Sequence, residues 1–267
     1  MQALILAAGM GKRLGELTAD RTKCMVELFG KPLIVRLLEQ LDRYGIKHTT
    51  IVVGYRADDL QQRIGCRFGN VEIKYIENPV YDKTNNIYSF YLAKDVLLTD
   101  DTVLFESDLV FDDAVLTRLL SDPRADLAVV AQYQSWMDGT VCSLEENDTI
   151  IKFTPKNQFD RNQVDEYYKT VNIYRFSKKV SQSHYVPFLE AYCSAMGHND
   201  YYEQVFRLLA HLDHFPMKAL RLVQEKWYEI DDIHDLANAE RLFASEDKLQ
   251  THYIRGNDYE HERKKSA

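Results

Sequence analysis

Cysteine is scarce in this 267-residue sequence, and the cysteines present show no spacing that would pair them or bind a metal. They are Cys24, Cys66, Cys142 and Cys193, with no C-x-x-C pair and no cluster of histidines beside them. Structural zinc sites and disulfide-rich domains both need closely spaced cysteines. We therefore expect buried or free thiols, and neither zinc ligands nor disulfides.

The sequence also lacks an excess of positive charge and any long hydrophobic run. It has 33 basic and 41 acidic residues, a formal charge of -8, whereas binding to nucleic acid or anionic membranes depends on many lysines and arginines. No segment approaches the roughly 20 apolar residues that span a bilayer. The first apolar run, residues 3–8, is too short for a signal peptide, and its cations follow it. These features predict a cytoplasmic protein that binds neither nucleic acid nor membranes.

Glycine is infrequent, yet two glycines fall two positions apart where the first apolar run ends. The segment from Leu6 to Leu14 reads L-A-A-G-M-G-K-R-L, so Gly9 and Gly11 precede two cations. Glycine lets backbone N-H groups approach an anion, and lysine and arginine then supply full charge. This pattern predicts a phosphate-binding loop, and an ordinary glycine-rich turn is the alternative.

Two well-known phosphate loops do not fit these residues. A dinucleotide fingerprint needs a third glycine at position 14, and here it comes one residue late, at Gly15. A P-loop needs glycine where Leu6 stands and serine or threonine where Arg13 stands. The next amphipathic helix begins only near Pro32, so the connection is much longer than the 2 to 6 residues that are usual. A long ordered loop of this kind indicates function.

The order of the predicted elements indicates an α/β fold. Strands and helices alternate through the first half, which is typical of a largely parallel sheet covered on both faces. We predict a Rossmann-like, mostly parallel mixed sheet with helices on both faces, and a small β-rich insertion after Trp136. The predicted strands are 3–8, 49–54, 71–76, 102–106, 126–132, 141–144, 149–153 and 169–176, followed by a strand pair near 219–223 and 227–230. The predicted helices are 32–44, 58–64, 86–98, 113–120, 178–195, 200–212 and 233–243.

Two acidic residues follow apolar strands. Residues 103–108 read V-L-F-E-S-D and residues 227–232 read W-Y-E-I-D-D, so Asp108 and Asp231 are expected at the carboxyl edge of the sheet, where ligands of open α/β folds bind. Carboxylate oxygens suit Mg2+. The alternative is that Asp231 or Asp232 caps the helix that follows.

These motifs together resemble a known family. L-A-A-G-x-G-x-R-L followed by Lys23 is similar to nucleotidyltransferases that make nucleotide-activated sugars and alcohols. Residues 85–93, N-N-I-Y-S-F-Y-L-A, are similar to bacterial phosphocholine cytidylyltransferases, and residues 106–109, E-S-D-L, resemble 2-aminoethylphosphonate cytidylyltransferases. The resemblance spans residue 1 to about Phe243. One departure is Thr22, where most of the wider family has proline before the lysine.

The resemblance implies a nucleotide-diphospho-sugar transferase-like fold, CTP as the nucleotide and Mg2+ as the cofactor. It implies that Asp108 and Asp231 bind the metal and that Lys23 and Arg13 are catalytic: Arg13 grips the β- and γ-phosphates, and Lys23 stabilises charge at the α-phosphate or the acceptor. The expected nucleotide-binding residues are Leu6, Ala7, Ala8, Gly9, Gly11, Lys12, Gly54, Tyr55, Asn85, Asn86 and Ser89.

The acceptor is the least determined part of the site. Aromatic faces and a carboxylate recognise a quaternary ammonium, and hydrogen-bonding acids suit a primary amine. The expected acceptor-binding residues are Asp138, Tyr174, Tyr201, Glu203 and Trp227. We expect transfer of CMP to a small amino-alcohol phosphate, with phosphocholine preferred. 2-Aminoethylphosphonate, a hexose 1-phosphate, and a nucleotide-sensing module without turnover are the alternatives.

The last residues differ in composition from the rest. Residues 245–267 have few apolar and many charged side chains, so they cannot offset their ordering entropy by burial. We predict one nucleotidyltransferase domain, residues 1–244, followed by a charged tail or a linker to a second domain. A homodimer and a fusion to an aminotransferase-like domain, which similar enzymes have, are both open.

Overall fold

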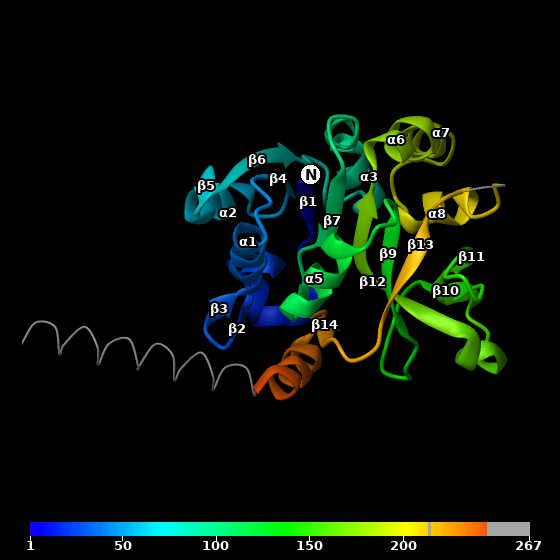
Figure 1. Cartoon of the computed structure of the whole chain (residues 1–267). Helices are drawn as coiled ribbons and strands as arrows, with labels where there is room; N and C mark the ends of the chain where they lie inside the picture. Colours follow the sequence, from blue (N-terminus) through cyan, green and yellow to red (C-terminus); the bar gives the residue numbers. More distant parts are fainter. Residues whose placement is uncertain (213–214, 245–267) are drawn as a thin grey trace, which may run out of the picture.

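A computed structural model describes residues 1–212 and 215–244, and it has the predicted α/β architecture (Figure 1). The main sheet is mixed, with helices packed on both of its faces. The four cysteines are free, and three of them are buried. The predicted tail, residues 245–267, lies outside the described residues.

Four parallel strands form one half of the sheet. They are β1 (Gln2–Ala7), β4 (His48–Val53), β6 (Val71–Glu77) and β7 (Thr102–Glu106), in the order β7-β1-β4-β6, and the short β5 (Arg67–Phe68) closes the edge. β1 is nearly all apolar because it is buried on both faces, as parallel strands usually are. Its carboxyl end, and that of β7, open on the same edge of the sheet.

A long antiparallel strand joins this half to the rest of the sheet. β12 (Tyr167–Phe176) pairs with β7 on one side and with β9 (Leu127–Gln132) on the other, and β13 (Lys218–Leu222) continues parallel to β9. β10 (Val141–Leu144) also pairs with β12 and forms the predicted hairpin with β11 (Ile150–Thr154). Parallel pairing therefore occurs among β7, β1, β4 and β6 and between β9 and β13, whereas the pairs that β12 makes with β7 and β9 are antiparallel.

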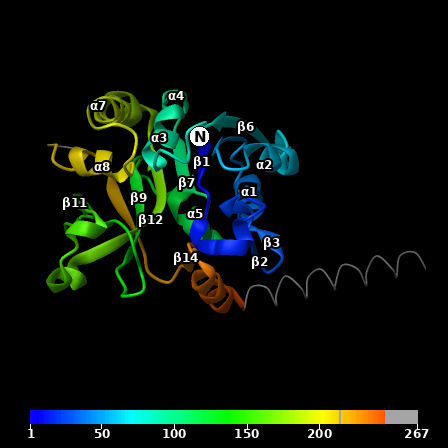
Figure 2. The ribbon, with the colours of Figure 1, turned by 180° about the vertical axis from the view of Figure 1, so that it is seen from behind.

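Alternate residues of β1 face two separate cores. Ala3 and Ile5 face the core under α1 (Leu33–Arg43), α2 (Ala57–Ile64) and α5 (Asp113–Ser121). Leu4 and Leu6 face the core under α3 (Asn86–Leu92), α7 (Val186–Met196) and α8 (Glu203–Leu209). The view from behind shows the two groups of helices on either side of the sheet (Figure 2). This alternation follows from the period of two in a strand.

Several elements differ from the predictions. The helix predicted over residues 86–98 breaks at Ala93 into α3 and α4 (Lys94–Leu97), and the one predicted over residues 178–195 contains α6 (Lys178–Val180), a π-helical turn (Ser181–Tyr185) and α7. β14 (Trp227–Glu229) pairs with β8 (Leu109–Phe111) and not with β13. Residues 233–244 form the closing helix. The shorter elements are η1 (Lys12–Thr18), η2 (Lys23–Met25), β2 (Glu27–Leu28), β3 (Lys31–Pro32), η3 (Lys156–Gln158) and η4 (Arg161–Glu166).

Candidate functional site

One large cavity, of about 1160 Å³, opens at the carboxyl ends of β1 and β7. Its wall combines the glycine loop after β1, the segment before α3, the residues after β7 and β14, and part of β12 and α8. This is the edge at which ligands of open α/β sheets bind. Most of the predicted site residues line it: Leu6, Ala8, Gly9, Gly11, Lys12, Arg13, Lys23, Asn85, Asn86, Ser89, Asp108, Asp138, Tyr201, Glu203 and Asp231.

The glycine loop is shaped around Lys23. Gly11 has a φ of 61°, in the left-handed region, and its carbonyl accepts a 2.9 Å hydrogen bond from Oγ1 of Thr18. A Cβ at Gly11 would lie 3.0 Å from Cβ of Lys23, closer than side chains normally pack. Gly11 is thus required both by its backbone angle and by the lysine that crosses it. The loop and Lys23 therefore form one unit.

Lys23 bridges the two acids predicted to bind metal. Its Nζ lies 2.5 Å from Oδ2 of Asp108 and 2.6 Å from Oδ1 of Asp231, and Arg13 Nη2 lies 2.7 Å from the same Asp231 oxygen. Burial lowers the pKa of Lys23, but the two carboxylates outweigh burial and hold the pKa above its usual value. Burial likewise raises the pKa of Asp231, while Lys23 and Arg13 bring it below its usual value. The ammonium and the Asp231 carboxylate are both charged at neutral pH.

The neighbouring Asp231 and Asp232 have different tasks. Oδ1 of Asp232 accepts hydrogen bonds from the backbone N-H groups of His234 (2.7 Å) and Asp235 (3.0 Å), so Asp232 caps the closing helix. Asp231 instead faces Lys23 and the cavity. The capping interpretation therefore holds for Asp232 alone.

One of the two predicted metal ligands, Asp108, belongs to a carboxylate cluster that suits a hard divalent cation. Oδ1 of Asp108 is buried and has no hydrogen-bond partner within residues 1–212 and 215–244. Glu106, Asp108 and Glu229 each offer a carboxylate oxygen within 4.8 Å of the others. A set of carboxylate oxygens with a vacant acceptor fits Mg2+, which binds such oxygens together with phosphate and water.

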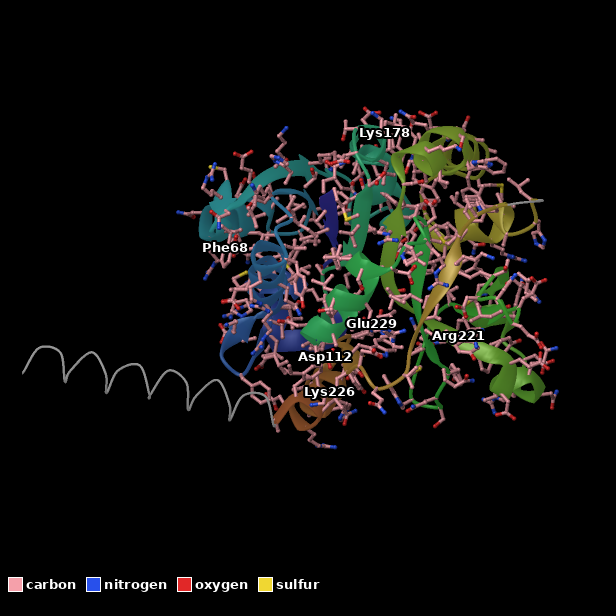
Figure 3. All side chains as sticks on the ribbon, in the orientation of Figure 1. Phe68, Asp112, Lys178, Arg221, Lys226 and Glu229 are labelled. Carbon is pink, nitrogen blue, oxygen red and sulfur yellow. The ribbon has the colours of Figure 1, made fainter. Side chains whose placement is uncertain are left out.

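Three glutamates that line the cavity form what we call the acid wall: Glu106, Glu203 and Glu229 (the last labelled in Figure 3). Burial raises the pKa of Glu106 well above its usual value, and nearby Asp108 adds to the effect. Burial also raises the pKa of Glu203 to about 7, and it raises that of Glu229 although Lys169 opposes it. The acid wall is thus a cluster of three carboxyl groups whose charge the surrounding cations do not fully offset.

Sequence reasoning missed Glu106 and Glu229, although a signal was present. Each stands two residues before a predicted metal ligand, in the pattern E-x-D at the end of a strand. Because side chains two apart along a strand share a face, each glutamate could have been placed on the same side as its aspartate. β14 is held beside β8 by two 3.0 Å bonds, from Lys226 N to Oδ2 of Asp112 and from Asp112 N to the Lys226 carbonyl (Figure 3).

Lys169 and Asn172 were also missed, and their positions depend on an irregular strand. The pairing of β12 with β9 shifts register between Thr170 and Tyr174, and Asn172 has a φ of 60°. A bulge of this kind re-aims side chains. Both Lys169 and Asn172 line the cavity, three positions apart, which a regular strand would not allow.

Five predicted residues do not line the cavity. Tyr174 is buried in an aromatic core, with its ring 4.7 Å from that of Phe206, and Trp227 packs beside Trp136 at 5.9 Å. Ala7 is buried within β1. Gly54 and Tyr55 support the glycine loop from outside: the N-H of Tyr55 donates to the Ala8 carbonyl at 3.1 Å. Direct contact of these residues with a ligand in this cavity is therefore not supported.

The part of the cavity wall formed by residues 78–89 has internal hydrogen bonds that the motifs did not reveal. Nδ2 of Asn78 donates to Oγ1 of Thr84 and to Oγ of Ser89, both at 3.1 Å, and Asn78, Tyr81 and Thr84 line the cavity. Asn86 connects this wall to the acid wall, because its Nδ2 donates to Oε1 of Glu106 at 3.2 Å. Its Oδ1 accepts from the backbone N-H of Tyr202 at 3.0 Å.

Comparison with known proteins decides the family. A family model described as the MobA-like NTP transferase domain matches residues 3–213 of the chain. The chain belongs to this family. The model covers the glycine loop, Lys23 and Asp108, whereas β14 and Asp231 lie beyond its end.

Two curated relatives of this MobA-like chain carry different names. It is 27% identical over 249 residues to the CMP-5'-(3-aminopropyl)phosphonate synthase of Streptomyces rubellomurinus, which covers 91% of this chain and 39% of that protein. It is 39% identical over 100 residues to the choline-phosphate cytidylyltransferase of Streptococcus pneumoniae, 36% of this chain and 41% of that protein. The chain thus aligns with less than half the length of either relative.

A solved structure shares the fold of this MobA-like domain. The CTP:phosphocholine cytidylyltransferase of Streptococcus pneumoniae superposes with a TM-score of 0.71 over 91% of this chain and 98% of that one, at 21% identity. The family and this neighbour agree with the predicted nucleotidyltransferase fold. Within the part of the chain that the structure describes, every helix is too short or too polar to span a bilayer.

Proposed function

We propose that this protein is a Mg2+-dependent cytidylyltransferase that transfers CMP from CTP to a small phosphate or phosphonate acceptor bearing a cationic nitrogen. The observation that carries the proposal is the junction of Lys23 with Asp108 and Asp231, beside a glycine loop and inside one cavity. Membership of the MobA-like NTP transferase family supports nucleotidyl transfer. CTP as the nucleotide is supported by the names of the relatives.

The residues of the cavity would act by positioning and by neutralising charge. An acceptor oxygen attacks the α-phosphorus, the bond from that phosphorus to the bridging oxygen breaks, and pyrophosphate leaves. A phosphate or phosphonate oxygen is already ionised at neutral pH, so no general base is needed. Arg13 and the N-H groups near Gly9 and Gly11 would hold the β- and γ-phosphates, and Lys23 would stabilise charge at the α-phosphate.

Asp108 and Asp231 would hold the magnesium ion, which when bound neutralises charge on the triphosphate. In the structure their oxygens contact Lys23. The charge of Lys23 therefore keeps the two carboxylates close together. If Asp108 and Asp231 hold the metal ion, Lys23 would be free to turn toward phosphate oxygens.

Two acceptors have specific support. Residues 85–93 and the similarity to the streptococcal enzyme favour phosphocholine. Alignment with the aminopropylphosphonate synthase over nearly the whole chain favours an aminoalkylphosphonate. Both acceptors combine an anionic phosphorus group with a cationic nitrogen. The acid wall would attract the cationic nitrogen.

A pyrophosphate-release assay tests the proposal. CTP, UTP, ATP and GTP are each combined with phosphocholine, phosphoethanolamine, 2-aminoethylphosphonate and glucose 1-phosphate, with and without Mg2+. We expect release only with CTP, Mg2+ and a nitrogen-bearing acceptor. A preference for glucose 1-phosphate, or for another nucleotide, would overturn the proposal, and so would failure of every combination.

A further inference from the structure

A glutamate that lines the cavity has a buried carboxylate oxygen without a hydrogen-bond donor. Glu203 begins α8, is only 8% exposed and lines the cavity. Its Oε2 has no hydrogen-bond partner in the described part of the chain. Leaving a buried polar atom unpaired is unfavourable, and more so for a charged group. Such an atom in a binding cavity indicates that a ligand supplies the donor.

The surroundings of Glu203 are short of positive charge. Glu106 and Glu229 add two further carboxylates, and Lys169 is the buried cation beside them. The Nζ of Lys169 donates to the Thr170 carbonyl at 2.5 Å and lies 3.5 Å from Oε2 of Glu229, so it acts on Glu203 through its charge and not by a hydrogen bond to Oε2. The missing partner of Glu203 is therefore a cation as well as a donor.

The aromatic rings behind Glu203 are already packed against one another. The ring of Tyr174 lies 4.7 Å from that of Phe206 and 5.8 Å from that of Tyr202, and Tyr202 meets Phe206 edge-on at 5.9 Å. The aromatic residues of the cavity lining are Tyr81, Phe153 and Tyr201. A quaternary ammonium is held by several aromatic faces and has no N-H group. It would leave Oε2 of Glu203 without a donor.

We propose that the acceptor carries an ammonium group with N-H bonds, and that Glu203 binds this group by a charge-assisted hydrogen bond. The acceptor class is then a primary aminoalkyl phosphonate or phosphate. This inference rests on the proposed function and selects one of its two acceptor types. Glu203 is the specificity-determining residue.

Two pairs of acceptors that differ only in N-methylation test this assignment. They are 2-aminoethylphosphonate with its N-trimethyl analogue, and phosphoethanolamine with phosphocholine. For the wild type we expect kcat/KM to be at least tenfold higher for the primary amine of each pair. Glu203→Gln should lower kcat/KM for the primary amines at least tenfold, mainly through KM, and change the trimethyl values less than threefold. Glu190→Gln, on the exposed side of α7, is the matched control.

Several results would overturn the assignment. A wild-type preference for the trimethyl acceptors would do so, as would an equal loss for both members of a pair in Glu203→Gln. If no acceptor is turned over, the proposed function fails, and binding of the same ligands by ligand-observed NMR still decides the role of Glu203. In that case wild type should bind 2-aminoethylphosphonate more tightly than its trimethyl analogue, and Glu203→Gln should remove the difference; equal binding in the wild type contradicts the inference.

Discussion

Gly11 and Lys23 are packed so closely that a single methyl group at Gly11 would lie 3.0 Å from the Cβ of the lysine. Gly15, in the same loop, also has a positive φ, 57° with a ψ of −121°, and it has open space around its Cα. Alanine variants at these two glycines therefore distinguish the effect of backbone strain from the effect of displacing Lys23.

Replacing each glycine by alanine should give different results. A left-handed alanine at Gly11 costs about 1–2 kcal/mol, and the φ and ψ of Gly15 are ones that glycine adopts more readily than any L residue, so Gly15→Ala should lose at least as much stability in urea unfolding as Gly11→Ala. Gly11→Ala should also lower kcat at least tenfold, because it displaces Lys23. Gly15→Ala should keep most of its activity. Equal kcat values in the two variants would show that the contact with Lys23 is irrelevant to turnover.

Loss of Lys23 should affect chemistry more than binding. If it stabilises charge that develops at the α-phosphate, Lys23→Met should lower kcat by roughly 10² to 10³, the usual effect of removing one such donor. The Kd for CTP should change much less. Lys31→Met, which removes a lysine paired with Glu39 at 2.8 Å, is the control. An intact kcat in Lys23→Met would contradict the proposed role.

The adjacent aspartates should respond in opposite ways. Asp231→Asn should abolish Mg2+-dependent turnover and weaken Mn2+ binding followed by electron paramagnetic resonance. Asp232→Ala should retain metal binding and activity, and should cost about 1 kcal/mol of stability because it removes a helix cap. Strong Mn2+ binding in Asp231→Asn would place the metal elsewhere on the cavity wall.

Glu203 should make stability depend on pH in an unusual direction. Burial raises its pKa to about 7 in the folded protein, above the ordinary value of 4.5, so the folded state binds the extra proton between these values. The free energy of unfolding therefore falls as the pH rises from 4.5 to 7. Glu203→Gln removes this loss, and its stability relative to the wild type should rise on the order of 1–3 kcal/mol between pH 4.5 and pH 8. Urea unfolding at both pH values checks this, and a constant difference would contradict it.

The parts of the site that follow strand ends were predictable from the sequence. Gly11 and Asp108 come directly after buried apolar runs, and strand ends on one edge of a sheet bring such residues together. The α/β fold was predictable for the same reason, because its strands and helices alternate with clear periods. Lys23 was predicted because the glycine segment and the lysine after it together resemble a family motif.

The acceptor-side residues were harder to predict because they depend on irregular and long-range structure. The bulge in β12 breaks the period of two, so it turns Tyr174 into the core and brings Lys169 and Asn172 to the cavity. Trp227 was misplaced because β14 pairs with β8, more than 100 residues earlier in the chain, and not with its neighbour β13. Local sequence patterns do not encode either event.

The two carboxylates that hold Lys23 come 85 and 208 residues after it in the chain. During folding, the glycine loop can form from local residues, but Lys23 lacks one of its two carboxylates until β14 has paired with β8 and placed Asp231 beside it. Contacts between such distant segments form late, because closing long loops costs entropy before the contact repays it. A partly folded chain therefore carries the loop and Lys23 without Asp231. Competence to react with a nucleotide thus becomes a property of the completed molecule, and turnover reports on whether folding has finished.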